Sequence, residues 1–449
     1  VVYGRAPVIA GIAGPLALGC YIGAFTALFG AGAAWLDRGR LLSPWTAAAL
    51  WTAIDHLRSF ALTGFPWATL GYAQHANDAL LALAPYTGVY GLSFVSVLGG
   101  AAMAEVGLAR ASKRRPRRAA VLALTTVVAL HAAGWVARRA ESEPPGPTVR
   151  IAVLQGNIDQ GVKWSKAWAD RILTTYESLA LEAAAGGAEW IVWPESSVPG
   201  FLETDPELRL RLKKLADATR ATHVFGVVGL EFDPVTRHPI VFDSAVSLDP
   251  SGAFSPRYDK SHLVPFGEYV PFRKLLGLVI GAVARGVARE NVTQGPGPRA
   301  VAVVRPGDGE ALITAVPICY ELLFPDVVRR MVADGAEVLL AITNDAWYGR
   351  TGAPYQFLAM TAVRSAETRV WTARAANTGV SAIIDSRGRV REQTAIFERA
   401  ALVADVPLRP APLGGSFYTR HGDVFAAACW GVLVAAGIAA ARRVRREKR

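Results

Sequence analysis

Three residue types in the polar part of the chain fit acyl transfer: a cysteine, a glutamate and a lysine. Cys319 follows an apolar run, Ala311 to Ile318, that is typical of a buried strand. Glu195 follows another apolar run, and Lys260 precedes a turn rich in proline and glycine. A thiol that attacks an acyl carbonyl needs a base for its proton and a cation or N–H donors for the developing oxyanion. Glu195 and Lys260 supply one of each, with Cys319 as the nucleophile.

Each of these residues also has an ordinary structural explanation. A free cysteine is among the most buried residue types, a glutamate can cap a turn, and a lysine is usually a surface residue. Taken alone, Cys319 would be a core cysteine. Cys20 and Cys429 fall inside apolar segments, so no disulfide framework or cysteine-rich metal site is expected beside Cys319. The functional interpretation gains weight because all three candidates follow a predicted buried strand.

The stretch from Thr148 onward alternates short β-rich runs with helical runs. The strands are apolar throughout, as in Trp190-Ile191-Val192-Trp193, which is typical of sheets covered on both faces. We therefore predict an α/β fold, an α-β-β-α sandwich, for residues 148–408. The predicted strands are 148–155, 189–193, 222–230, 241–248, 299–305, 311–318, 336–343, 379–385 and 400–406, and the predicted helices are 165–184, 206–220, 325–334 and 354–369.

Five apolar segments are long enough to span a bilayer, and hydrophobic residues make up 52% of the chain. Asp55, His56 and Arg58 interrupt the second of them. For these charges a local pair of Asp55 and Arg58, three residues apart on a helix, is favoured over a catalytic role. One such segment alone could be a buried core helix, but five bordered by arginines indicate a membrane protein. The segments are 8–36, 41–63, 79–104, 119–137 and 424–441.

The net charge of +11 resides in two basic clusters, residues 110–118 and 442–449. They flank apolar segments instead of covering a folded face, which favours cytoplasmic membrane loops and argues against a nucleic-acid partner. With both clusters in the cytoplasm, residues 138–423 lie outside. The predicted organisation is a transmembrane region of about four spans (1–137), a proline-rich linker (138–147), a catalytic domain (148–408), a C-terminal span (424–441) and a basic cytoplasmic tail (442–449).

The motifs around the three candidates resemble a known family. Trp193-Pro194-Glu195-Ser196, the segment from Asp259-Lys260 to Pro271, and Ile318-Cys319-Tyr320-Glu321 resemble the nitrilase superfamily. The flanking apolar segments and Leu62-Thr63-Gly64-Phe65-Pro66-Trp67 narrow the resemblance to the apolipoprotein N-acyltransferase family, over nearly the whole chain. The resemblance implies a nitrilase-like external domain on a multi-pass protein of the bacterial inner membrane, with that domain on the periplasmic side. The chain opens on Val1 with no signal pattern, and we expect that it lacks the first spans of the family.

Carried over residue by residue, the resemblance implies a catalytic triad. Glu195 matches the general base, Lys260 the oxyanion-stabilising lysine and Cys319 the acylated nucleophile. One departure lies outside this triad: Phe357 stands where members of the family often have histidine, which puts a polar role at that position in doubt.

The resemblance also implies residues that support the triad. Three of them, Glu268, Tyr320 and Glu321, match supporting residues of the active site, and Trp164 matches a tryptophan placed near the acyl donor. The remaining matches are expected to shape the site without taking part in the chemistry: Asn344-Asp345-Ala346-Trp347-Tyr348-Gly349, Arg364 and Glu367.

The implied reaction is a ping-pong N-acylation. Cys319 takes an acyl chain from a membrane phospholipid as a thioester, and the free α-amino group of a diacylglyceryl-cysteine on an apolipoprotein then accepts it. An amine competes well for a thioester when water is excluded, so a lipid-lined site suits this chemistry. No metal or other cofactor is required. The apolar segment 275–287 fits a lid or lipid-docking segment and an amphipathic surface helix about equally well.

Two other functions remain to be weighed. A membrane-tethered amidase of the nitrilase type would hydrolyse a small amide, but such a substrate needs neither the spans nor the segment 275–287. A catalytically inactive membrane scaffold would not need Glu195, Lys260 and Cys319 together.

Overall fold

The computed structural model describes residues 8–140, 147–163, 165–271, 292–408 and 415–447. The chain divides into two compact units. One contains Pro144–Gly415, and the other contains Gly11–Glu143 together with Ser416–Arg449. The first unit, which contains all three candidate residues, is called the catalytic unit below, and the second is called the helical unit.

The first sheet of the catalytic unit has the strand order β12-β1-β2-β3-β4-β5. Its centre is parallel, with Val153 of β1 opposite Val192 of β2 and Val192 opposite Val224 of β3. All of β2 is buried, as its uninterrupted apolar sequence predicts. The strands are β1 (Thr148–Gln155), β2 (Trp190–Val192), β3 (Thr222–Phe232), β4 (Pro239–Leu248), β5 (Tyr258–Asp259) and β12 (Ala400–Pro407).

The second sheet has the order β11-β10-β9-β8-β7-β6. Its centre is also parallel, since β8 pairs in this way with both β7 and β9, and both β8 and β9 are fully buried. The strands are β6 (Val301–Val304), β7 (Ala311–Ala315), β8 (Val338–Thr343), β9 (Trp371–Ala376), β10 (Ala382–Ile384) and β11 (Val390–Gln393).

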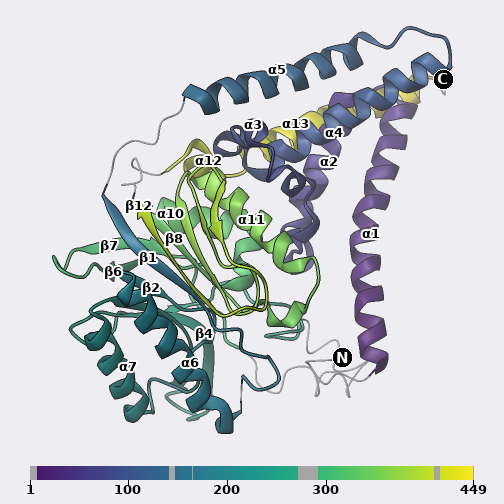
Figure 1. Ribbon diagram of the computed structural model, residues 1–449. Helices are drawn as coiled ribbons and strands as arrows, with labels where there is room; N and C mark the ends of the chain where they lie inside the picture. Colours follow the sequence, from purple (N-terminus) through teal and green to yellow (C-terminus); the bar gives the residue numbers. More distant parts are fainter. Residues whose placement is uncertain (1–7, 141–146, 164, 272–291, 409–414, 448–449) are drawn as a thin grey trace. The chain divides into compact units, whose positions relative to one another are not determined.

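The two sheets pack on each other, with β1 and β12 against β9, and helices cover their outer faces (Figure 1). Helices α6 (Lys166–Ala185) and α7 (Pro206–Thr219) pack on the first sheet, and α10 (Pro325–Ala333) and α11 (Ala353–Thr368) pack on the second. This is the predicted α-β-β-α sandwich, although the strands β5, β9 and β11 were not predicted from the sequence.

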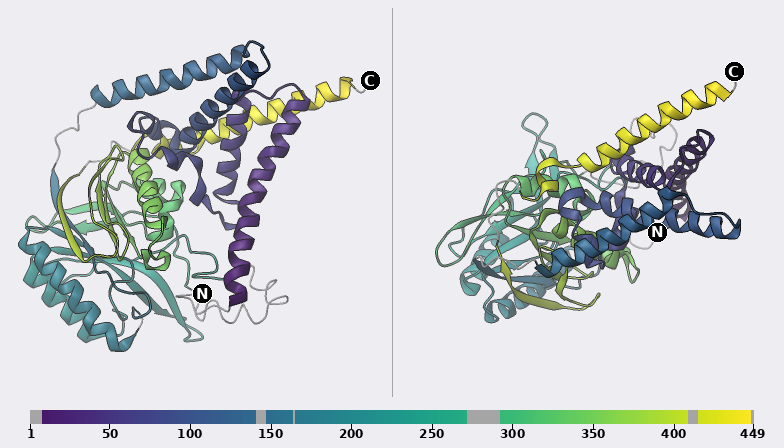
Figure 2. Two further views of the ribbon diagram at one scale, coloured as in Figure 1. Left: turned by 45° about the vertical axis from the view of Figure 1, so that its right-hand side comes forward. Right: turned by 90° about the horizontal axis from the view of Figure 1, so that it is seen from above.

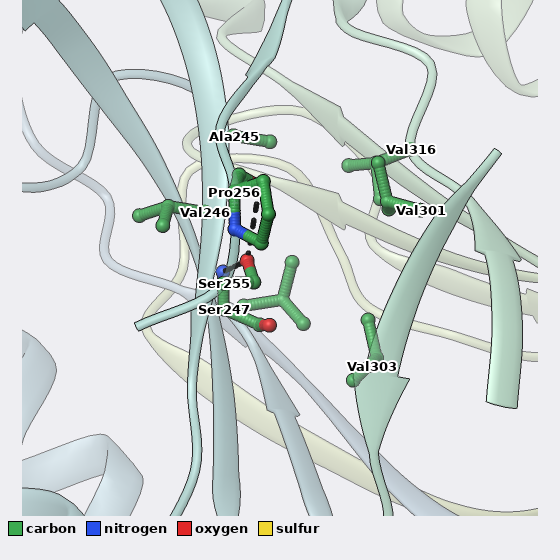
Figure 3. Close-up of a pocket in the computed structure, with 9 residues that line it drawn as sticks. Ala245, Val246, Ser247, Ser255, Pro256, Val301, Val303 and Val316 are labelled. Carbon is green, nitrogen blue, oxygen red and sulfur yellow. Dashed lines mark hydrogen bonds between the residues drawn. The ribbon is translucent and has the colours of Figure 1, made fainter. Parts of the chain in front are cut away.

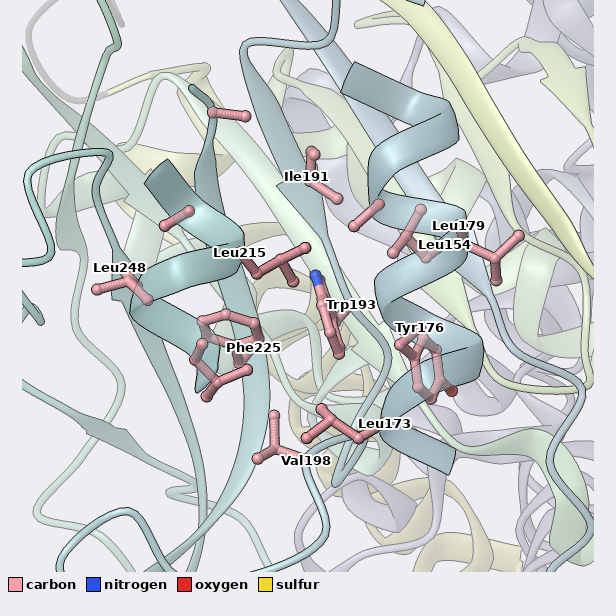
Figure 4. Packing of buried hydrophobic residues seen from close by; sticks show 14 of the residues in the cluster. Leu154, Leu173, Tyr176, Leu179, Ile191, Trp193, Val198, Leu215, Phe225 and Leu248 are labelled. Carbon is pink, nitrogen blue, oxygen red and sulfur yellow. The ribbon is translucent and has the colours of Figure 1, made fainter. Parts of the chain in front are cut away.

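The core beneath α6 and α7 is built around one tryptophan (Figure 4). The ring of Trp193 stacks on Tyr176 at a centroid distance of 5.1 Å and meets Phe225 edge-on at 4.8 Å. Its Nε1–H donates to Nδ1 of the buried His223 at 3.1 Å, and burial lowers the pKa of that imidazole to about 3. His223 is therefore neutral and can accept this bond. These contacts hold fixed the backbone that leads directly to Glu195.

The helical unit contains four helices long and apolar enough to cross a membrane, among the residues that the structure describes (Figures 1 and 2). They are α1 (Val8–Arg38), α4 (Ala84–Ala111), α5 (Arg118–Ala140) and α13 (Val424–Glu447). They overlap four of the five predicted spans. The unit also contains the short helices α3 (Asp78–Leu81) and α12 (Phe417–His421).

The segment 41–63 differs from the long helix that its hydropathy suggests. Helix α2 (Pro44–Arg58) has 15 residues, or about 22 Å at 1.5 Å per residue, which is short of a 30 Å hydrocarbon core. The helix ends at Arg58, and 3₁₀ turns follow at Ala61–Thr63, Pro66–Ala68 and Leu70–Gln74, with positive φ angles at Leu62 and Thr63. The predicted local pair is confirmed, since Arg58 donates to Asp55 at 2.8 Å.

Candidate active site

Glu195 follows β2 on a backbone held against the neighbouring strand. Ser196 has a positive φ of 46°, and its neighbour Ser197 donates its N–H to the carbonyl of Gly226 on β3 at 2.9 Å. A Cβ on Gly226 would lie 2.4 Å from the carbonyl oxygen of Pro194 and 2.6 Å from Cα of Glu195. Only glycine fits there, so Gly226 is what allows the Glu195 segment to approach β3 this closely.

Cys319 stands at a strained turn after β7. Its φ is +47°, a conformation that is costly for a residue with a Cβ and that is concentrated at functional sites. Ile318 still forms a bridge with Ile342 of β8, and the 3₁₀ helix η4 (Cys319–Leu323) begins at the cysteine. Cys319 is 7% exposed. Considered without the rest of the sequence, Cys319 would be a core cysteine; the structure places this buried thiol near the other two candidates.

Glu321 joins the cysteine turn to the lysine loop. Its Oε2 accepts from the N–H of Ile318 at 2.8 Å. Its Oε1 accepts from the hydroxyl of Tyr258 at 2.7 Å and from both the N–H and the hydroxyl of Ser261, at 2.7 and 2.6 Å. One buried carboxyl group is therefore held from two sides: by Tyr258 and Ser261 next to Lys260, and by Ile318 next to Cys319. Glu321 acts on the geometry of the site and not on its chemistry.

Lys260 is fully buried among three carboxyl groups. Its Nζ lies 2.6 Å from Oε1 of Glu268, 3.1 Å from Oδ2 of Asp243 and 3.3 Å from Oε1 of Glu195. Burial acts to lower the pKa of Lys260, but the carboxyl groups around it, that of Glu268 above all, outweigh burial and hold this pKa well above its usual range. A permanently charged ammonium group is thus fixed within the site, as stabilisation of an oxyanion requires.

Glu195 is held by donors on both of its carboxylate oxygens. Besides Lys260 on Oε1, the backbone N–H of Asn344 donates to Oε2 at 2.7 Å. The thiol of Cys319 also lies near this carboxylate, whose charge acts on the pKa of the thiol. Burial acts to raise the pKa of Glu195, but the ammonium of Lys260, with that of Lys163, helps to bring it below its usual range. Glu195 is therefore ionised at neutral pH and can accept the thiol proton.

The thiol itself is neutral at rest. Burial, followed by the negative charge of Glu195, holds the pKa of Cys319 well above its usual range, against the opposing charge of Lys260. A preformed thiolate is not what this geometry stabilises. It favours a neutral thiol beside an ionised carboxylate, and the thiol loses its proton as it attacks.

The supporting residues lie at different distances from the chemistry. Glu268 accepts from Lys260 and from the N–H of Val264, at 2.6 and 2.8 Å, and so fixes the lysine within its loop. Tyr320 is buried and packs edge-on against Phe324 at 5.1 Å. Trp164 and the segment 275–287 lie outside the described residues.

Of the residues expected to shape the site, Asn344, Asp345, Arg364 and Glu367 are buried, whereas Trp347 is exposed. Asp345 pairs with Arg374 of β9 at 2.9 Å, and Arg364 pairs with Glu367 on α11 at 3.0 Å. Phe357 is fully buried, with the guanidinium of Arg374 5.2 Å from its ring centroid. These pairs stabilise the turn that carries Asn344, whose N–H reaches Glu195.

Two residues at the site were not indicated by the sequence motifs. Lys163 is buried, and its Nζ donates to the backbone carbonyl of Glu195 at 2.9 Å. Burial lowers the pKa of Lys163 to about 8, mainly against the charge of Glu195. Asp243 lies within the apolar strand β4, and a carboxyl group in such a run is the one signal in the sequence that marks it.

A separate small pocket lies between the two sheets (Figure 3). It is lined mainly by valines, among them Val224, Val246, Val301 and Val303. Ser255 accepts a hydrogen bond from the N–H of Ser247 at its edge, at 2.9 Å. None of the three candidate residues lines this pocket, so it has no part in the chemistry described here.

Residues 150–411 match a family described as "Carbon-nitrogen hydrolase", and residues 1–102 match one described as "Apolipoprotein N-acyltransferase N-terminal domain". The first match contains Glu195, Lys260 and Cys319. The two matches together cover most of the catalytic unit and the start of the helical unit.

Among curated proteins, the apolipoprotein N-acyltransferase of Geobacter metallireducens is 39% identical over 402 residues, which are 89% of this chain and 74% of that protein. The enzyme of the same name from Shewanella oneidensis is 30% identical over 99% of this chain and 83% of its own length. That from Nitrosomonas europaea is 33% identical over 94% and 81%. Among solved structures, an amidase from Nesterenkonia sp. AN1 matches with a TM-score of 0.45 and 18% identity, over 65% of this chain and 100% of the amidase.

Proposed function

We propose, because this chain belongs to the apolipoprotein N-acyltransferase family, that it N-acylates the diacylglyceryl-cysteine at the N-terminus of lipoproteins. The acyl donor is a membrane phospholipid, and the acyl chain passes through a thioester on Cys319. Glu195 is the base, and Lys260 stabilises the oxyanion. Glu268, Tyr320 and Glu321 support this triad, and Trp164 contributes to acyl-donor binding.

The first half-reaction forms the thioester. The sulfur of Cys319 bonds to the carbonyl carbon of the phospholipid ester while its proton moves to the Glu195 carboxylate. The carbonyl oxygen becomes an oxyanion, which the ammonium of Lys260 stabilises. When the intermediate collapses, the bond from carbon to the glycerol oxygen breaks, and Glu195 returns the proton to that oxygen. A lysophospholipid leaves, and Glu195 is ionised again.

The second half-reaction forms the amide. The α-amino group of the acceptor, in its neutral form, attacks the thioester carbonyl, and Glu195 takes one of its protons. The carbon–sulfur bond then breaks, and the proton passes from Glu195 to the sulfur of Cys319. The enzyme returns to its starting state with an acylated lipoprotein as the product.

One arrangement carries this proposal: a thiol at a strained turn lies beside a carboxylate that a fixed ammonium and a backbone N–H hold. Since both half-reactions need one base to receive and return one proton, an ionised Glu195 beside Cys319 suits each of them. The apolar helices α1, α4, α5 and α13 support a lipid substrate, because they would hold the enzyme where its donor is found.

The test is a reconstituted transfer assay. The full chain in phospholipid vesicles is incubated with a synthetic diacylated lipopeptide, and mass spectrometry follows the peptide. We expect an added acyl chain on its α-amino group, matched by the appearance of lysophospholipid, and neither product with Cys319→Ala. Hydrolysis of small aliphatic amides without any acylated peptide would instead favour the membrane-tethered amidase, and neither activity would favour the scaffold.

We also propose that the protein is a multi-pass protein of the bacterial inner membrane, with residues 148–408 on the periplasmic side. The proposed organisation is a transmembrane region (1–137), a linker (138–147), the catalytic domain (148–408), a C-terminal span (424–441) and a cytoplasmic tail (442–449). Protease added to intact spheroplasts should cleave within residues 148–408 and leave a tag at the C-terminus intact. Cleavage of the tag with protection of residues 148–408 would reverse the orientation.

A further inference from the structure

The active site contains one more carboxyl group than the proposed reaction uses. Oxygen atoms of Glu195, Asp243 and Glu268 all lie within 4.8 Å of one another. The ammonium of Lys260 lies among them, and that of Lys163 is held close by on the carbonyl of Glu195. If all three carboxyl groups were ionised, three negative charges would face two positive ones in a buried space. One proton on a carboxyl group balances the cluster.

Asp243 has the contacts of a protonated acid. Its backbone carbonyl accepts from the N–H of Lys260 at 2.8 Å, so the pairing of β4 with β5 fixes it beside the lysine. Its Oδ2 accepts from Nζ of Lys260 at 3.1 Å. Its Oδ1 is buried, and no donor among the described residues reaches it. A buried carboxylate oxygen without a donor is costly, whereas a carboxylic acid needs only an acceptor there.

The acceptor for such a proton is Glu195. A carboxyl oxygen of Asp243 lies within 4.8 Å of one of Glu195, and two carboxyl groups can share a hydrogen bond only when one of them carries a proton. Glu195 already accepts from Lys260 and from the N–H of Asn344, which favours its ionised form. Burial, together with the charges of Glu195 and Glu268, holds the pKa of Asp243 well above its usual range, against the charge of Lys260. The proton therefore resides on Asp243.

We propose that Asp243 is a positioning residue for the reaction: a carboxylic acid that stays protonated and donates a hydrogen bond to Glu195. In this role it leaves Glu195 as the single ionised base facing Cys319. Because Asp243 is neutral, it adds no negative charge near the thiol or the oxyanion, and the positive field of Lys260 is not cancelled. The effect on acyl transfer rests on the function proposed above, whereas the protonation state does not.

The pH dependence of the free energy of unfolding distinguishes a protonated Asp243 from an ionised one, and it can be measured without an activity assay. In the unfolded chain this carboxyl titrates near its ordinary value of 3.8, and in the folded chain its pKa is raised. The folded state then binds more protons, so this group's contribution to stability falls as pH rises above 3.8. The amide introduced by Asp243→Asn would need no added proton and would still donate to Glu195 and accept from Lys260. An ionised Asp243, in contrast, would be a salt-bridge partner that an amide cannot replace.

The experiment measures thermal unfolding of the full chain in detergent micelles at pH 7, for wild type, Asp243→Asn and Asp243→Ala. Asp249→Asn, the same change in the turn that follows β4, is the matched control. We expect Asp243→Asn to raise Tm by at least about 2 °C, with a gain that shrinks as pH falls toward 4. We expect Asp243→Ala to lower it and Asp249→Asn to leave it within about 1 °C. An unchanged or lower Tm for Asp243→Asn overturns the proposal.

A second measurement tests the base, Glu195, through the reactivity of the Cys319 thiol that it deprotonates. Iodoacetamide alkylation of Cys319 in the same samples is read by mass spectrometry, with Cys20 as the internal reference. Asp243→Asn should react within about threefold of wild type, and Asp243→Ala should react about tenfold more slowly or slower. Equal slowing by both variants overturns the proposal. Because neither measurement uses phospholipid or lipoprotein, failure of the proposed acyl transfer would leave both results intact.

Discussion

Replacing Glu321 with glutamine should loosen the link between the cysteine turn and the lysine loop. Four donors meet Oε1, from Tyr258, Ser261 and His262, so the amide oxygen must take that position. The amide NH₂ then faces the N–H of Ile318 at the 2.8 Å separation that now holds a hydrogen bond. One bond to a charged group is lost and a buried N–H is left unsatisfied, which costs about 2–4 kcal/mol.

For a unit of this size, that cost corresponds to a fall in Tm of about 4–16 °C. The fall in Tm is measured by thermal unfolding of the full chain in detergent. The rate at which iodoacetamide alkylates Cys319 is measured in the same samples. We expect both Tm and the alkylation rate to fall, because the turn at Cys319 loses its tie to the Lys260 loop. Glu337→Gln, the same change at a half-buried glutamate just before β8, is the matched control and should alter neither. If Glu321→Gln also alters neither, Glu321 does not link the two segments.

Three further predictions concern the base and its surroundings. Gly226→Ala places a Cβ 2.6 Å from Cα of Glu195. It should destabilise the chain by about 1–3 kcal/mol and lower the rate of acyl transfer at least tenfold. Gly352→Ala is the control and should do neither, because its added Cβ meets nothing within 4 Å. Lys260→Met leaves buried carboxylates without their cation, so transfer should fall about 10²-fold or more in the vesicle assay, and activity near that of wild type would remove the lysine from the mechanism. Lys163 loses its proton near pH 8 in the folded chain and near 10.5 in the unfolded chain. Between these values the unfolded state binds more protons, so stability should rise with pH. Lys163→Met should flatten this rise in unfolding measured at pH 7.5–10.5, and an unchanged slope would contradict the prediction.

Most of the fold follows from the sequence because its strands are apolar runs of the right length. β1 and the four helices of the sandwich lie within two residues of their predicted bounds. Strand β9 was not predicted, since Trp371-Thr372-Ala373-Arg374-Ala375-Ala376 has few strong strand formers. Its pairing with β8 and β10, and the ion pair of Arg374 with Asp345, make it a strand. Such tertiary contacts cannot be read from a local pattern.

The triad motifs predict which residues meet, but not what holds them. Each of Glu195, Lys260 and Cys319 stands in a recognisable motif, and the structure brings the three together. The N–H of Asn344 on Glu195 is a backbone contact that no side-chain pattern encodes. Asp243 reaches the site through strand pairing between β4 and β5, which depends on the register of the sheet. These contacts set the protonation states, so the chemistry depends on residues outside the motifs.

The central claim is that Cys319 carries the acyl chain between donor and acceptor. It is tested most directly by incubating the full chain with phospholipid alone, without lipopeptide, and measuring the mass of the Cys319 peptide. We expect one acyl chain on the Cys319 peptide, and neutral hydroxylamine should release it. The adduct should be present in Cys20→Ala and absent in Cys319→Ala. The central claim is contradicted if wild type acylates lipopeptide but shows no adduct at Cys319, or if Cys319→Ala still transfers the chain.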